Sequence, residues 1–186
     1  MTRTMDHGPS GPAATRFRLR LAVLTVSDRC ASGDQEDRSG EVIVRWAQER
    51  GAEVVERSCV PDETSRIVPV LLRWADGDGV DLVLTTGGTG FTARDVTPEA
   101  TRAVVERPAR GVAEALVRTG EASTRFSLLS RGEVGIRGRT LVVNLPGSTG
   151  GVRDGLETLD PILDHAVGLL RNEGGPEESH APPSEA

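Results

Sequence analysis

The stretch from Val80 to Thr101 constrains the fold of this chain more than any other part of the sequence. It begins with the apolar run Leu82–Leu84, which is typical of a strand buried on both faces of a parallel sheet. The glycine loop Gly87-Gly88-Thr89-Gly90 follows. Thr97-Pro98 then predicts a helix start, with Thr97 as N-cap and Pro98 at the first helical position. This order is the usual layout of a ligand site at the carboxyl edge of an α/β sheet.

The glycine loop has more than one interpretation. Its consecutive N–H groups, helped by neighbouring threonine hydroxyls, can form an anion-binding nest, but glycines after a strand often form only a tight turn. Residues 88–93 also match the dinucleotide pattern G-x-G-x-x-G/A, which would suggest a dinucleotide-dependent oxidoreductase. That motif opens its helix inside the glycine loop, whereas the helix signal here comes only at Thr97, so the match is poor.

Strand and helix signals alternate along the rest of the chain. They predict an α/β fold: a three-layer α/β/α sandwich with a mostly parallel sheet. Further strands are expected at 17–26, 53–60, 133–137 and 140–145. Helices are expected from Ser39 as N-cap to 50, from about 62 with Pro69 inside, at 97–107, 112–120 and 123–130, and as several helices up to 170. Residues 1–16 and 172–186 have the composition of disordered arms, which leaves one domain at 17–171.

The composition excludes several classes of site. The chain has no lysine, so all 22 basic residues are arginines, which excludes a Walker A loop, a Schiff-base lysine and the lysine-dependent serine hydrolases. The net charge of −6 argues against nucleic-acid binding, and no apolar run is long enough to span a membrane. Two cysteines are too few for a disulfide framework, and we expect a cytoplasmic protein.

Four loops should meet at the carboxyl edge of the predicted sheet: Ser27-Asp28, Pro61-Asp62, Thr86 to Asp95, and Pro146 to Ser148. They bring two carboxylates, Asp62 and Asp95, beside the glycine loop, although Asp62 is also a good N-cap residue. Two carboxylates alone would suit a glycosidase. Mg²⁺, however, typically binds through one or two carboxylates plus substrate phosphates, so with an anion nest beside them we expect phosphoryl or nucleotidyl transfer.

Eight motifs, in order, resemble those of the MogA/MoaB family of molybdenum-cofactor biosynthesis proteins, which includes a matching domain of gephyrin. The resemblance covers about Arg18 to Leu170. The motifs are Thr25-Val26-Ser27-Asp28, Asp37-Arg38-Ser39-Gly40, Val60-Pro61-Asp62-Glu63, Thr86 to Thr92, Arg94 to Thr101, Leu129-Ser130-Arg131, Gly135-Ile136-Arg137-Gly138 and Asn144-Leu145-Pro146-Gly147.

The resemblance implies a homotrimer that adenylylates molybdopterin with Mg-ATP and releases pyrophosphate, its product then serving a molybdate-insertion enzyme. It implies that Asp62 and Asp95 are the catalytic and Mg²⁺-binding carboxylates. The implied substrate-binding residues are Ser27, Asp28, Thr86, Gly87, Gly88, Thr89, Gly90, Ser130, Pro146, Gly147 and Ser148. Any role of a family lysine must fall to arginine or be absent. The alternative is a non-catalytic molybdopterin-binding or scaffold protein of the same family.

Overall fold

The computed structural model describes residues 18–171, so both predicted arms lie outside the described residues. A sheet of six strands runs in the order β2-β1-β3-β6-β5-β4, and its first four strands are parallel. The strands are β1 (Arg20–Val26), β2 (Glu53–Val60), β3 (Leu82–Thr86), β4 (Arg107–Pro108), β5 (Val134–Arg137) and β6 (Thr140–Leu145). The predicted fold class is confirmed, with β3 at the centre of the parallel part.

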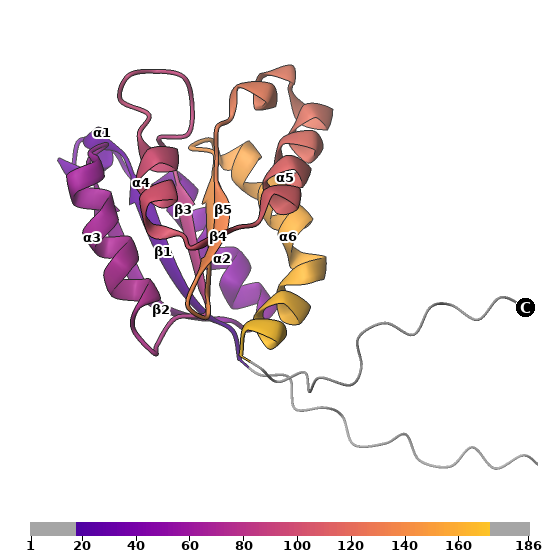
Figure 1. The fold of residues 1–186 in the computed structure, drawn as a ribbon. Helices are drawn as coiled ribbons and strands as arrows, with labels where there is room; N and C mark the ends of the chain where they lie inside the picture. Colours follow the sequence, from indigo (N-terminus) through magenta and orange to yellow (C-terminus); the bar gives the residue numbers. More distant parts are fainter. Residues whose placement is uncertain (1–17, 172–186) are drawn as a thin grey trace, which may run out of the picture.

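Helices cover both faces of the sheet (Figure 1). They are α1 (Asp28–Ala31), α2 (Arg38–Arg50), α3 (Thr64–Ala75), α4 (Thr97–Val104), α5 (Arg110–Ser123) and α6 (Thr149–Leu170), with a 3-10 helix at Arg125–Leu129. Alternate residues of β1 point to opposite faces. Leu21 and Val23 pack in the core beneath α2, α5 and α6, whereas Ala22 and Leu24 pack beneath α3 and α4.

Three predicted helix starts were wrong by one or two residues. Asp37, not Ser39, caps α2, because its carboxylate accepts the N–H of Gly40 at 2.8 Å. Asp62 caps no helix, and α3 follows Glu63 instead. Thr97 is the first residue of α4 rather than its cap, since its hydroxyl donates to the Gly87 carbonyl at 2.9 Å. The Thr97 side chain is thereby tied to the glycine loop at the carboxyl edge.

Other boundaries also differ from expectation. Helix α4 ends at Val104, and residues 107–108 pair with β5 as an antiparallel strand. The loop expected after Ser27 contains the short helix α1. The last helical region is one helix of 22 residues that continues through Pro161, and the buried Leu159 and Leu163 on either side keep it packed on the sheet. No helix between residues 18 and 171 is both long and apolar enough to cross a bilayer.

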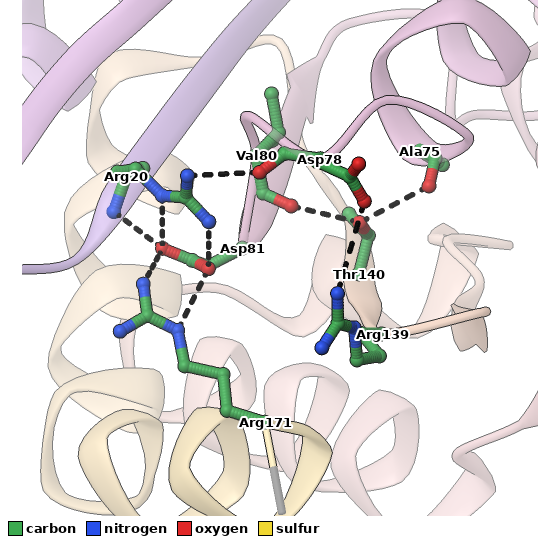
Figure 2. Close-up of polar contacts among 8 residues, drawn as sticks. All are labelled: Arg20, Ala75, Asp78, Val80, Asp81, Arg139, Thr140 and Arg171. Carbon is green, nitrogen blue, oxygen red and sulfur yellow. Dashed lines mark hydrogen bonds and ion pairs between the residues drawn. The ribbon is translucent and has the colours of Figure 1, made fainter.

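A buried carboxylate ties the amino edge of the sheet together (Figure 2). Asp81 directly precedes β3, and its side chain is only 5% exposed. It accepts hydrogen bonds from the backbone N–H of Arg20 at 2.8 Å, from the Arg20 guanidinium, and from Arg171 Nε at 2.9 Å. A cavity of about 620 Å³ lies here, but its charged lining is largely engaged in such ion pairs, so we regard it as structural.

Candidate functional site

The loops after β1, β2, β3 and β6 meet at the carboxyl edge of the sheet, as predicted. The backbone N–H of Asp28 donates to Asp62 Oδ2 at 2.8 Å, which joins the first two loops. The Thr86 hydroxyl donates to the Pro146 carbonyl at 2.7 Å, which joins the other two. Because β2 and β3 lie on opposite sides of β1, this edge includes the topological switch point, where open α/β sheets bind ligands.

The glycine loop depends on its glycines. Gly87 and Gly88 have φ angles of 96° and 62°, in the left-handed region that glycine occupies without strain. A Cβ on Gly87 would lie 2.2 Å from the Val26 carbonyl oxygen, and one on Gly88 would lie 2.4 Å from Thr97 Oγ1. No described residue accepts a hydrogen bond from the N–H of Gly88 or Thr89. Two adjacent backbone donors therefore remain for an anion.

Asp62 lies in a reciprocal contact with Asp28. The backbone N–H of each residue donates to the carboxylate of the other, at 2.8 and 3.1 Å. The Arg94 guanidinium also donates to the Asp28 carboxylate, through Nε at 3.0 Å and Nη2 at 2.5 Å. The hydrogen bond from Arg94 lowers the pKa of Asp28. The pKa of Asp62 is raised, first by burial and then by the negative charges of Asp28 and Asp95. A bound cation would relieve that repulsion.

Asp95 has the opposite electrostatic environment. Its Oδ2 accepts the backbone N–H of Thr92 at 2.7 Å. Burial alone would raise the pKa of Asp95, but the hydrogen bonds from Thr92 and Gly90, together with the charge of Arg131, outweigh burial and lower it. Asp95 is thus held as a carboxylate by its own loop.

The donor set fits a substrate-bound Mg²⁺ better than a dedicated metal centre. Between residues 18 and 171, no group of three or more His, Cys, Asp or Glu side chains is arranged to hold a metal ion. Mg²⁺ usually takes one or two carboxylates and completes its shell with waters and substrate phosphates. Asp62 and Asp95, on loops that flank the free N–H groups of the glycine loop, are the residues that could supply those carboxylates.

A mainly apolar cleft of about 400 Å³ adjoins the glycine loop. One side is formed by Thr89, Gly90 and the loop after β6, and the other by α5, the 3-10 helix and the start of α6. The apolar wall comprises Leu116, Val117, Phe126 and Leu129, of which Phe126 is 70% exposed. These four residues were not among the predicted site residues. The run Phe126-Ser127-Leu128-Leu129, mainly apolar within a short predicted helix, was the sequence signal that could have indicated Phe126 and Leu129.

The structure divides the predicted substrate-binding residues into two groups. Ser130, Pro146 and Ser148 line the cleft with Thr89 and Gly90. The others lie at the same edge but have structural contacts. Ser27 caps α1, and Thr86 is fully buried against Pro146. Gly147 packs so closely on Gly87 that a Cβ added to Gly147 would lie 3.2 Å from the Gly87 Cα. Ser148 also caps α6, through the N–H of Gly151 at 3.1 Å.

The sequence is similar to that of proteins of molybdenum cofactor biosynthesis. A family described as "Probable molybdopterin binding domain" matches residues 22–165. The molybdopterin adenylyltransferase of Helicobacter pylori J99 is 36% identical over 154 residues, covering 82% of this chain and 88% of that protein. The Drosophila melanogaster molybdenum cofactor synthesis protein cinnamon is 38% identical over 153 residues, covering 82% of this chain but only 26% of cinnamon.

Solved structures agree with these relatives. The crystal structure of the molybdopterin biosynthesis enzyme MoaB from Thermus thermophilus matches with a TM-score of 0.78 and 44% identity, covering 83% of this chain and 97% of that one. The chain therefore belongs to the molybdopterin-binding domain family of molybdenum cofactor biosynthesis, together with the MoaB and MogA proteins.

Proposed function

We propose that this protein is a molybdopterin adenylyltransferase. It would transfer AMP from Mg-ATP to molybdopterin and release pyrophosphate. The observation that carries the proposal is the meeting of Asp62, Asp95 and the free N–H groups of Gly88 and Thr89 at one edge of the sheet. The Helicobacter pylori and Escherichia coli relatives named molybdopterin adenylyltransferase support it.

The chemistry is a nucleotidyl transfer. An oxygen of molybdopterin forms a bond to the α-phosphorus of ATP, and the bond from that phosphorus to the bridging oxygen of pyrophosphate breaks. Catalysis of this kind depends mainly on positioning and on stabilising charge. Mg²⁺, when bound, would neutralise the phosphate oxygens.

The residues of the chain have separate roles in this proposal. Asp62 and Asp95 would hold the Mg²⁺, and the N–H groups of Gly88 and Thr89 would donate to a phosphate oxygen. Ser130 and Ser148 would orient a substrate in the cleft, whose apolar wall suits a flat ring system. Asp28, which is bound to Arg94 and to the Asp62 backbone, would position Asp62.

AMP transfer to purified molybdopterin tests the proposal. With Mg-ATP, the wild type should form adenylylated molybdopterin, and Asp62→Asn and Asp95→Asn should each lower kcat by about 100-fold or more. Asp78→Asn is the matched control, because this side chain is 99% exposed and lies at the opposite edge. Molybdopterin binding without transfer by the wild type would contradict the proposal and favour the non-catalytic scaffold.

Several further expectations belong to the same proposal. The resemblance to the MogA/MoaB family implies a single molybdopterin-binding domain over residues 17–171 and a homotrimer. It also implies a molybdate-insertion enzyme as partner and a cytoplasmic location. The relative from Chlorobaculum tepidum, named molybdenum cofactor biosynthesis bifunctional protein, matches over only 54% of its length. Light scattering of the purified protein tests the trimer directly.

A further inference from the structure

One arginine holds both ends of the loop that carries Asp95. Arg131 follows the 3-10 helix and precedes β5. Its Nε donates to the Gly90 carbonyl at 2.7 Å, and its Nη2 donates to the Asp95 carbonyl at 2.5 Å. The guanidinium also pairs with Glu99 on α4, and the backbone N–H of Arg131 donates to the Thr89 carbonyl at 2.9 Å. Residues from both ends of the loop therefore converge on a single side chain.

The loop has little else to fix it. Residues 91–94 are exposed. Beyond the contacts with Arg131, the loop is held by hydrogen bonds among Gly90, Thr92 and Asp95 and by the ion pair between Arg94 and Asp28, whose side chains are 55% and 48% exposed. The Arg131 side chain is better protected, at 34% exposed. A guanidinium offers five donors in a rigid plane, so it can bond two carbonyls and a carboxylate at once, whereas an ammonium is a single point donor.

We propose that Arg131 is a positioning residue for Asp95. It acts through the carbonyls of Gly90 and Asp95, fixes the ends of the loop, and so sets the place of the Asp95 carboxylate beside the glycine loop. It does not touch the substrate. The catalytic consequence rests on the proposed function, but the effect on the loop does not.

A neighbouring arginine provides a matched control. Arg102 on α4 pairs with Glu133 and so joins the same helix to the same segment before β5. Within residues 18–171, the Arg102 side chain makes no hydrogen bond or ion pair with residues 90–95. Arg102→Met should therefore remove a comparable link between the two segments while leaving the loop unchanged.

Hydrogen exchange of the loop and steady-state kinetics test the proposal together. In Arg131→Met, the amides of Thr92 and Asp95, which are hydrogen-bonded within the loop, should exchange about 10- to 100-fold faster than in the wild type, because a charge-assisted link that closes the loop is lost. The kcat for AMP transfer should fall by about 10- to 100-fold, and the KM for ATP should change much less. Arg102→Met should alter neither the loop exchange nor kcat.

Two milder variants keep the test decisive if Arg131→Met does not fold. Arg131→Lys keeps the positive charge but loses the planar set of donors that bonds both carbonyls, so the loop amides should exchange faster than in the wild type. Glu99→Gln keeps both carbonyl contacts, so its loop should stay close to wild type. Unchanged loop exchange in Arg131→Lys and Arg131→Met would overturn the proposal even if the wild type transfers AMP. Conversely, faster exchange with no AMP transfer by the wild type would refute only the proposed function.

Discussion

Replacing Asp81 by asparagine should destabilise the domain substantially. The substitution keeps the shape of the side chain but leaves the guanidiniums of Arg20 and Arg171 without their shared buried counter-charge. Removing one partner of a buried ion pair typically costs about 3–5 kcal/mol. The Arg20 side chain is 38% exposed and the Arg171 side chain 18%, so water compensates in part and we expect about 3 kcal/mol.

Urea unfolding followed by circular dichroism measures this loss. The free energy of unfolding should fall by about 3 kcal/mol, while its dependence on urea concentration stays unchanged. In thermal unfolding, the same loss corresponds to a fall in Tm of about 6–12 °C for a domain of this size. Asp76→Asn is the control, because the Asp76 carboxylate makes a similar bidentate ion pair with Arg137, at 2.6 and 3.0 Å, but its side chain is 55% exposed. A loss for Asp81→Asn below about 1 kcal/mol, the range of exposed pairs, would refute the reasoning from burial.

The same carboxylate should make this difference depend on pH. Burial alone would raise the pKa of Asp81, but hydrogen bonds from Arg20 and Arg171 outweigh it and lower the pKa in the folded state. A lowered folded pKa stabilises the protein above the unfolded value, about 3.9, and this contribution is lost as the pH falls through the folded pKa. The stability difference between wild type and Asp81→Asn should therefore be constant from about pH 5 to 7 and shrink below about pH 4.

Three other substitutions or reactions have defined outcomes. Gly40→Ala places a Cβ 2.1 Å from Asp37 Oδ2, so it should disrupt the α2 cap and cost about 1–2 kcal/mol in urea unfolding. Asn144→Ala leaves two buried threonine hydroxyls and a backbone N–H without their partner and should cost about 3 kcal/mol by the same assay. Burial and the neighbouring Cys30 raise the pKa of Cys59 to about 12, so at pH 8 iodoacetamide should alkylate Cys59 slowly until the protein is unfolded.

The sequence predicted the parallel core and the meeting of four loops because both depend on regular patterns. Strand β2 was predicted with its observed bounds, and the apolar run at Leu82 does lie at the centre of the parallel strands. Local rules failed where a side chain makes a distant contact instead of the expected local one. Asp62 bonds the N–H of Asp28, 34 residues away, rather than capping α3, and Thr97 bonds the Gly87 carbonyl rather than capping α4.

The cleft could not be predicted in full for a related reason. Its apolar wall comes from α5 and the 3-10 helix, and apart from the run at residues 126–129 their sequence does not distinguish a cleft wall from an ordinary core face. Arg131 was recognisable as part of a family motif, but its contacts with Gly90 and Asp95 depend on how the segment before β5 folds back over the glycine loop. Such contacts follow from the tertiary arrangement and not from spacing along the chain.

The place where the described domain begins and ends has a consequence for protein architecture. Arg20 opens β1, Arg171 follows α6, and both bind Asp81 (Figure 2), at the edge of the sheet opposite the candidate site. When both ends of a domain lie close together and far from its binding site, the domain can be joined to other domains or inserted between them without obstructing that site. This geometry suits a portable module, and the matching region of cinnamon makes up only 26% of that protein.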